Sequence, residues 1–395
     1  MQPATPWYRT ITREQWRVLW AAKLGWMLDA MDFLLYVMAI GKLKEHFGFG
    51  DATAGFLGTA TLLSSAAGGI LFGVVADRMG RVRALMTTIL VFSLCSLGAA
   101  TSQAVWQLVV WRTLLGLGMG GEWASGAVLV SESWPAEHRT KAVSIMQSGW
   151  ALGYIAAALL AGLVLDVLPL GESAWRWLFA LGVLPALVTF WIRRSVPEPT
   201  VWRERVPEQR VRNPFRVLFG KQYRGRTVMA TLLSASVQFA NWGLFFWLPS
   251  FLARPLEQGG AGMSIVRSTG WIIPVQMGAY LGYNSFGFIA DRLGRRRTFV
   301  LYLVTAAVLV PVYGQMARSP VVLMALGPLL GFVGYGYFSM FGSFLAELFP
   351  TAVRATGQGL TYNLGRGLGA LAPYTIGYVA TLPNVGIGRA SCRER

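Results

Sequence analysis

The chain has 395 residues, of which 54% are hydrophobic and only 13% are charged, and its mean hydropathy is +0.48. A soluble domain carries about 25% charged residues, so this composition excludes a soluble globular protein and indicates one embedded in a lipid bilayer. The net charge of +17 could suggest nucleic-acid binding, but the basic residues are divided among alternate loops and do not gather on one surface or tail.

Long segments without Asp, Glu, Lys or Arg predict membrane-spanning helices, because a helix needs about 20 apolar residues to cross the bilayer core. One uncharged run is long enough for two helices, and the polar sequence TSQ at 101–103 divides it. Three segments that hold a few charged residues complete a set of eleven expected spans. In chain order they are 16–40, 52–76, 84–111 (two spans), 142–165, 175–193, 227–253, 268–290, 298–317, 319–346 and 355–381.

Basic residues concentrate in every second loop between these spans. The largest group lies between residues 193 and 226, and smaller groups precede the first span and follow the second, fourth, eighth and tenth. The positive-inside rule places such loops in the cytoplasm. We therefore expect a multi-pass protein of the plasma (inner) membrane with a cytoplasmic N-terminus.

An eleven-residue motif occurs twice in the chain. GVVADRMGRVR at 73–83 and GFIADRLGRRR at 287–297 agree at seven positions with an offset of 214 residues, and SESWPAEHR at 131–139 matches AELFPTAVR at 346–354 with an offset of 215. Two matches at nearly one offset indicate a duplicated half, and because both copies lie on the basic side the halves run parallel.

The duplication predicts the organisation of the chain. We expect an N-terminal six-helix bundle at 1–192, a basic cytoplasmic linker at 193–226 and a C-terminal bundle of five visible spans at 227–383. The last residues, 384–395, form an atypical tail.

The repeated segments are expected to act as gating loops. Glycines permit tight turns where helices pack closely, a carboxylate favours the N-terminal end of a helix, and arginines can bind carbonyls or pair with acids of neighbouring helices. Such a ring of charge could hold one face of the bundle shut and release it, although positive-inside anchoring is an alternative for any single arginine. The candidates are Gly73, Asp77, Arg78, Gly80, Arg81, Glu132, Arg139, Gly287, Asp291, Arg292, Gly294, Arg295, Glu347 and Arg354.

Four ionisable residues are expected deep within spans: Asp29, Asp32, Arg112 and Arg366. Glu122 lies ten residues beyond Arg112 and is expected nearer the cytoplasm. An ionisable group at mid-bilayer costs roughly 3 kcal/mol or more, so it is rarely kept without a function. Burial disfavours a charged carboxylate, so the acids could carry a proton, and we expect Asp29, Asp32, Arg112 and Glu122 to serve proton coupling. Arg366 is the candidate for an anionic substrate, because guanidinium stays charged and binds carboxylate with two hydrogen bonds. A structural ion pair is the alternative.

Polar residues on other expected helices could line the same site. Amides and hydroxyls suit a substrate that bears hydroxyl groups, but each of them could equally hold helices together. These candidates are Gln147, Tyr154, Gln238, Asn241, Gln276 and Asn363.

Motifs of enzyme chemistry do not occur in the sequence. We find no metal-ligand cluster, P-loop or nucleophile elbow, so we expect neither an enzyme nor an ATP-driven pump, and no cofactor or metal.

The repeated motif resembles the signature loops of the major facilitator superfamily, and Arg112 with Gly116 and Gly120 resembles the fourth-helix motif of that family. WMLDAMDFLLY at 26–36 and the segment 112–135 are similar to the sialate and monocarboxylate proton symporters, and less closely to the metabolite and aromatic-acid proton symporters. The resemblance implies an all-α fold of two parallel, pseudo-symmetric six-helix halves that act by alternating access, functional as a monomer.

The chain departs from this pattern at its end. The eleventh expected span stops near residue 383, and GRASCRER follows where a twelfth helix should be. We expect 384–395 to be an assembly or read-through scar at a truncation.

These features predict a proton symporter that imports a small organic anion, such as a monocarboxylate or a sialic-acid-like sugar acid. Its partners would be the substrate, protons and the lipid bilayer, without nucleic acid. The alternatives are a proton symporter of another metabolite (an aromatic acid, dicarboxylate, sugar or zwitterion) and a proton-antiport exporter. A non-transporting receptor or an energy-independent pore is disfavoured by the resemblance.

Overall fold

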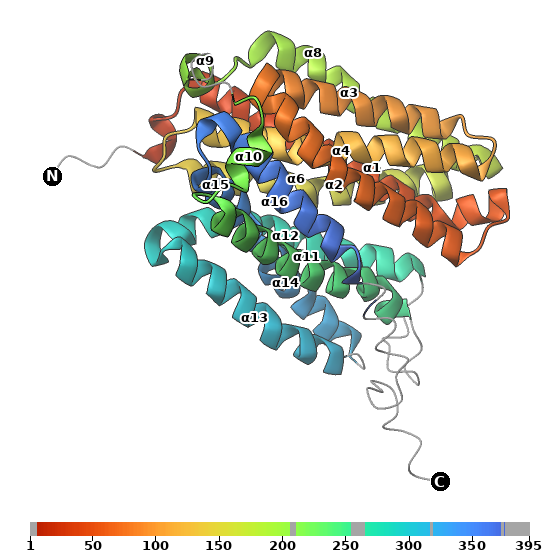
Figure 1. The fold of residues 1–395 in the computed structure, drawn as a ribbon. Coiled ribbons are helices and arrows are strands. Elements are labelled where there is room, and N and C mark those ends of the chain that lie inside the picture. Colours follow the sequence, from red (N-terminus) through yellow and green to blue (C-terminus); the bar gives the residue numbers. More distant parts are fainter. Residues whose placement is uncertain (1–5, 206–210, 254–264, 317–318, 373–374, 376–395) are drawn as a thin grey trace.

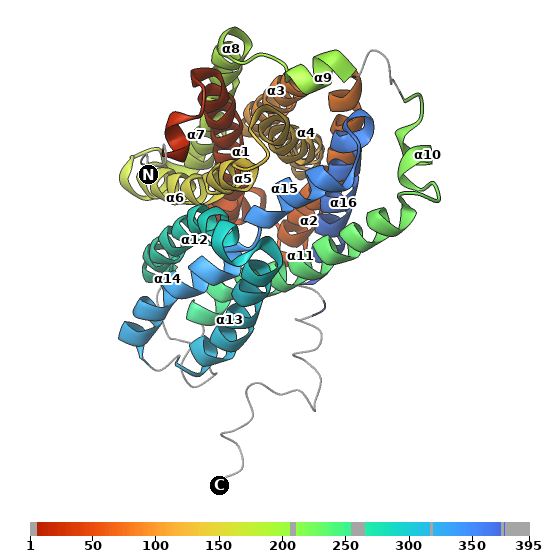
Figure 2. The ribbon, with the colours of Figure 1, turned by 90° about the vertical axis from the view of Figure 1, so that its left-hand side faces the viewer.

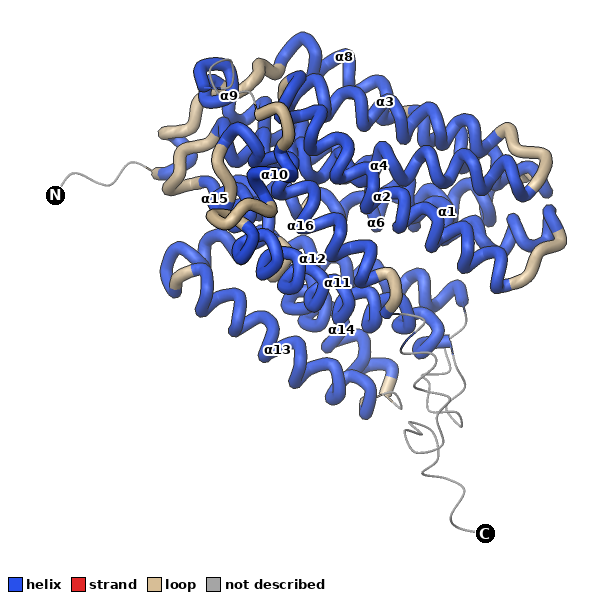
Figure 3. The backbone as a smooth tube through the Cα atoms, viewed as in Figure 1, coloured by secondary structure: helices blue, strands red, loops and turns tan. Residues whose placement is uncertain are grey.

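The computed structural model describes residues 6–205, 211–253, 265–316, 319–372 and 375. Throughout these ranges the chain is helical and contains no strand (Figure 3). The helices form two bundles that lie side by side (Figure 1), which confirms the all-α fold of two halves.

The N-terminal bundle contains six helical segments, of which the fifth and sixth are broken into shorter pieces. The fifth begins as α5 and continues after Ser148 as α6 and η2, and the sixth consists of α7, η4 and α8. The elements are η1 (Trp7–Arg9), α1 (Arg13–Phe47), α2 (Asp51–Met79), α3 (Arg81–Ala100), α4 (Val105–Ser133), α5 (Arg139–Gln147), α6 (Gly149–Ala161), η2 (Gly162–Val167), η3 (Gly171–Ser173), α7 (Ala174–Ala180), η4 (Leu181–Val183) and α8 (Pro185–Ser195).

Along the chain, two short helices, α9 and α10, follow this bundle and precede the C-terminal one. They are followed by five helical segments, the last of which begins with η6. The elements are α9 (Thr200–Arg205), α10 (Pro214–Leu218), α11 (Arg224–Ala253), α12 (Ile265–Leu293), α13 (Arg295–Gln315), α14 (Pro320–Gly336), α15 (Ser339–Leu348), η6 (Thr351–Val353) and α16 (Arg354–Gly369).

The expected spans all lie on helices as far as the structure describes them. Eight helices of the described ranges are long and apolar enough to cross a membrane. Large apolar side chains such as Leu187, Phe190, Val304 and Val308 are exposed on the outer surface, where water would disfavour them and lipid would not. Residues 373–374 and 376–381 of the last expected span and the tail 384–395 lie outside the described residues.

The repeated motif forms the same turn in both bundles. Gly80 joins α2 to α3 with a φ of 112°, and Gly294 joins α12 to α13 with a φ of 85°. A side chain strains this left-handed region, so glycine permits two helices to be joined by a single residue. The turn predicted from the duplicated sequence is therefore present twice.

The charged turns between helices lie together at one end of the molecule. The starts of α1, α3, α5, α13 and α16 lie there together with the ends of α2, α4, α12 and α15 and with α9 and α10 (Figure 1). We call this end the basic face and the other end the opposite face. The bundles meet along α2, α4 and α16 on one side, where α11 packs against α16, and along α5, α6 and α12 on the other (Figure 2).

Candidate functional site

The five ionisable residues selected from the sequence for proton coupling and substrate binding are all buried. Asp29 and Asp32 on α1, Arg112 and Glu122 on α4, and Arg366 on α16 are each no more than 2% exposed. They point into the protein interior and not toward lipid, and they form two groups. The first lies within the N-terminal bundle, and the second joins the two bundles.

Asp32 forms the first group with Ser96 on α3 and Arg112. The Ser96 hydroxyl donates a hydrogen bond of 2.5 Å to Oδ1 of Asp32, while Oδ2 of Asp32 has no partner among the described residues. The Arg112 charge acts on Asp32, and its guanidinium lies 4.3 Å from the centre of the Tyr36 ring. Two of the Arg112 nitrogens also lack a hydrogen-bond partner within the described ranges. Asp32 is therefore held by one hydrogen bond and lies in the electrostatic field of a buried guanidinium.

Arg366 forms the second group with Asp29 and Glu122. Its guanidinium lies 5.7 Å from the Trp26 ring and 5.9 Å from the Tyr362 ring, and it interacts electrostatically with both acids. All four carboxylate oxygens and two Arg366 nitrogens lack a hydrogen-bond partner in the described part of the chain. Buried polar groups are normally bonded, so this cluster has unused capacity for a proton or an anion.

Aromatic side chains surround the second group, and the sequence analysis did not select them. Trp123 on α4 stacks on Tyr362 on α16 with ring centres 3.5 Å apart, and Phe245 stacks on Tyr335 with ring centres 4.1 Å apart. The Trp123 contact joins the two bundles. The available signal was the presence of aromatic residues with polar tips inside nearly uncharged spans.

Two of the predicted polar residues make defined hydrogen bonds near this cluster. Gln147 accepts a bond of 2.9 Å from the Trp123 indole and also contacts Tyr283. The Asn363 amide donates to the Gly120 carbonyl at 3.2 Å, which holds α16 against α4. Asn363 thus contributes to contact between the bundles, while its amide oxygen is unbonded within the described ranges.

The other four polar candidates lie near the same tyrosines or remain unbonded. Gln238 contacts Tyr362, Gln276 contacts Tyr335 through a hydrogen bond, and Tyr154 interacts electrostatically with Tyr335. Asn241 has an amide oxygen without a partner among the described side chains.

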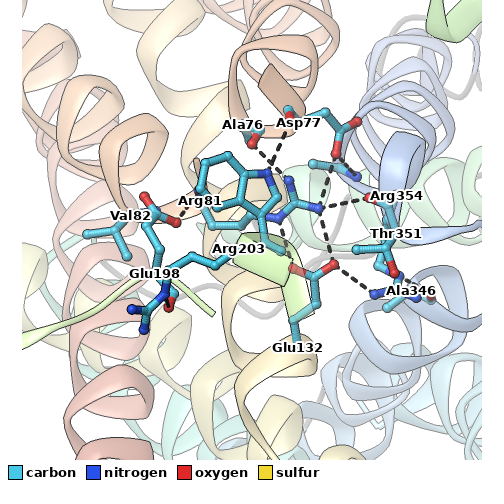
Figure 4. A network of polar contacts seen from close by, with 12 residues as sticks. Ala76, Asp77, Arg81, Val82, Glu132, Glu198, Arg203, Ala346, Thr351 and Arg354 are labelled. Carbon is cyan, nitrogen blue, oxygen red and sulfur yellow. Dashed lines mark hydrogen bonds and ion pairs between the residues drawn. The ribbon is translucent and has the colours of Figure 1, made fainter. Parts of the chain in front are cut away.

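On the basic face, Arg81 is the centre of a buried network (Figure 4). It donates two hydrogen bonds to Glu132, at 2.8 and 3.1 Å, and lies 3.3 Å from Asp77. It also donates to the carbonyls of Ala76, at 2.9 Å, and Thr351, at 3.0 Å. Thr351 belongs to the C-terminal bundle, so the Arg81 side chain joins both bundles.

Two acids of the N-terminal bundle bind the start of α16. Asp77 accepts hydrogen bonds from the backbone of Ala355 (3.1 Å) and Thr356 (2.8 Å) and from the Thr356 hydroxyl (2.7 Å). Glu132 accepts a bond of 2.7 Å from Arg354. A helix N-terminus favours negative charge, so these contacts stabilise the closed arrangement of the basic face.

The C-terminal bundle repeats this arrangement toward the start of α5. Asp291 pairs with Lys141 at 2.5 Å, and Glu347 pairs with Arg295 at 2.5 Å and with Arg139 at 3.6 Å. The acids here are more exposed, at 35% for Asp291 and 38% for Glu347. The basic face is therefore closed by two related sets of ion pairs, one buried and one partly exposed.

The remaining predicted gating residues occupy the same face. Gly73 and Gly287 lie where a helix of the other bundle passes closely, α16 for Gly73 and α5 for Gly287. Arg78 donates a hydrogen bond of 2.9 Å to the Arg212 carbonyl in the linker. Arg292 is exposed on the surface.

Glu198, between α8 and α9, is a member of the network that the sequence analysis missed. Its carboxylate accepts hydrogen bonds of 2.7 to 3.2 Å from the backbone N–H groups of Arg81, Val82 and Arg83 at the start of α3. The nearby Trp202 indole donates to the Asp77 carbonyl at 3.2 Å. The signal in the sequence was weak, because Glu198 is one of three acids in a basic linker and nothing local reveals its partner.

Comparison with known proteins identifies the family of the chain. The family model described as "Major Facilitator Superfamily" matches residues 24–378. The chain is 35% identical to the "Probable 4-methylmuconolactone transporter" of Cupriavidus pinatubonensis, with 97% of this chain and 88% of that protein covered. It is 32% identical to the "Cis,cis-muconate transport protein" of Acinetobacter baylyi, with coverages of 94% and 90%. It is 30% identical to the "Sialic acid transporter NanX" of Escherichia coli, with coverages of 97% and 92%.

A solved structure shares the fold. The proton:xylose symporter XylE superimposes with a TM-score of 0.76 at 19% identity, and the match covers 93% of this chain and 88% of that one. The fold resemblance and the family match lead to the same assignment. The chain belongs to the Major Facilitator Superfamily and is a multi-pass membrane transporter, not an enzyme.

Proposed function

We propose that this transporter is a proton-coupled symporter that imports a small organic acid. The observation that supports this most strongly is the cluster of Arg366, Asp29 and Glu122, in which a buried cation lies near two carboxylates that make no hydrogen bonds within the described residues. The Arg366 guanidinium would bind the substrate carboxylate, and protonation of the acids would release it from their competition. The muconate and sialic acid transporters among the relatives support an organic acid as the substrate class.

Asp32 is proposed as the proton carrier that couples substrate binding to proton movement. It lies on the same helix as Asp29, and each acid lies in the electrostatic field of a different arginine. Loss of the proton from Asp32 would strengthen its attraction to Arg112, and binding of a proton would weaken it. The polar candidates near Tyr335 and Tyr362 would orient the rest of the substrate.

The ion pairs of the basic face would then act as the gate. Opposite charges hold the bundles together while substrate and proton enter from the opposite face, and separation of these pairs would open the path to the other side. We propose that the basic face is cytoplasmic, that the N-terminus lies on that side of the inner membrane, and that one copy suffices for transport. We propose that the chain is divided into an N-terminal bundle at 1–192, a linker at 193–226 and a C-terminal bundle at 227–383.

Proteoliposomes with an imposed pH gradient test this proposal. With the interior more alkaline, radiolabelled cis,cis-muconate and sialic acid are offered separately, and at least one of them should accumulate above its external concentration. A protonophore should abolish the accumulation. In a separate experiment, a membrane potential imposed without a pH gradient shows whether net charge moves with the substrate. Equilibration without accumulation of either acid would contradict symport of these acids.

A further inference from the structure

A cavity of about 800 Å³ opens on the basic face, beside α10. Val74 and Arg78 of α2 form one side of it, and residues 211–217 of the linker form the other. None of the residues of the two buried charged groups lines it.

Three arginines, Arg78, Arg212 and Arg216, line this cavity, and no acidic residue is among those that line it. Arg78 reaches only the backbone carbonyl of Arg212, and neither Arg212 nor Arg216 pairs with an acid in the described ranges. Guanidinium groups gathered without a counter-charge repel one another, and a bound phosphate can satisfy them with charge-assisted hydrogen bonds.

Exposed aromatic rings lie next to these arginines. Phe215 is 37% exposed and Phe219 is 52% exposed, on either side of Arg216. A segment that combines exposed rings with basic side chains is typical of the membrane interface, where rings enter the acyl boundary and cations meet anionic headgroups. The source of phosphate that fits this place is therefore the bilayer.

The linker also contacts both bundles at this point. Leu218 packs in one cluster with Phe349, Val353 and Leu360 of the C-terminal bundle, and Ile70 of α2 borders the same cluster. Anything that holds α10 against α2 therefore also holds the two bundles together on the basic face.

We propose that this cavity binds the phosphate headgroup of an anionic membrane lipid and that the bound lipid stabilises the closed basic face. The proposal rests on the cavity, its uncompensated arginines and the adjoining rings. It is independent of which substrate the transporter carries and of whether transport is coupled to protons.

The test compares thermal unfolding of the full chain in nanodiscs of phosphatidylcholine alone and of phosphatidylcholine with phosphatidylglycerol. The variant Arg212→Gln/Arg216→Gln removes two charges from the cavity. The control Arg224→Gln/Arg226→Gln removes two exposed charges a few residues away that do not line it. Phosphatidylglycerol should raise the Tm of the wild type and the control, and the cavity variant should lose most of that increase. Inorganic phosphate in phosphatidylcholine discs should give no increase.

A second measurement does not depend on the variants. A photoactivatable phosphatidylglycerol should cross-link the wild-type chain within the peptide that contains 211–217. An equal Tm increase in the cavity variant, equal loss in the control, or cross-links confined to other segments would overturn the proposal. An increase with inorganic phosphate alone would overturn the assignment to lipid.

Discussion

Glu132 on α4 accepts a hydrogen bond of 2.7 Å from Arg354 at the start of α16, so a buried acid of one bundle holds an arginine of the other. Arg81 binds the same carboxylate from within the N-terminal bundle. Glu132 therefore binds two arginines, Arg81 and Arg354, and its replacement would leave both without this carboxylate. This single residue links the closed state of the basic face to charge.

The variant Glu132→Gln should open the basic face. Removing one partner of a buried ion pair costs about 3 to 5 kcal/mol, which is at least a hundredfold in the ratio of closed to open molecules at about 1.4 kcal/mol per factor of ten. Spin labels at the exposed positions 83 and 297, at the starts of α3 and α13, should report a longer distance across the face.

The matched control is Glu347→Gln, because Glu347 occupies the equivalent position in the C-terminal bundle. Its carboxylate is 38% exposed, and exposed ion pairs contribute about 0 to 1 kcal/mol. Its label distance should change much less. An equal effect of the two variants would contradict the idea that burial makes the Glu132 contacts the stronger part of the gate.

Gly73 should be intolerant of a side chain for a steric reason. A Cβ atom there would lie 2.7 Å from the Ala355 carbonyl oxygen, whereas a Cβ on Gly55, on the same helix, would meet nothing within 4 Å. Gly73→Val should therefore separate α2 from α16 and lengthen the distance between the same labels, and Gly55→Val should not. Unchanged closure in Gly73→Val would show that the close approach is not required.

Arg366→Gln should weaken substrate binding. A hydrogen bond to a charged group contributes about 1.5 to 3 kcal/mol, so the KM for an organic acid should rise roughly tenfold to a hundredfold. Arg366→Lys keeps the charge but loses the two-bond geometry and should be intermediate. KM values from initial uptake rates provide the measurement, with the exposed Arg224→Gln as control. A normal KM in Arg366→Gln would remove Arg366 from the binding site.

The turns of the repeated motif could be predicted because their cause is local. The spacing of Gly80 and Gly294 within a duplicated sequence requires the same short connection twice, and the structure has it. The pairing of gate acids with neighbouring helices was also expected. The partner of Glu198 was not, because its contact with the start of α3 depends on the path of the linker after α8.

The division of the buried charges into two groups could not be predicted either. Asp29 and Asp32 are three residues apart, and residues at this spacing lie on one face of a helix. Three residues rotate a helix by about 300°, leaving the side chains roughly 60° apart, and that difference directs Asp32 toward Ser96 on α3 and Asp29 toward Arg366 on α16. The neighbours that decide the outcome come from helices distant in sequence.

Substrate-driven proton entry tests the central claim most directly. Proteoliposomes that enclose a pH-sensitive dye receive an external organic acid without a prior gradient, and the wild type and the exposed control Glu45→Gln should acidify the interior. Asp32→Asn should give no acidification while still exchanging internal for external substrate. Acidification by Asp32→Asn at the wild-type rate would contradict the role of Asp32 as the proton carrier.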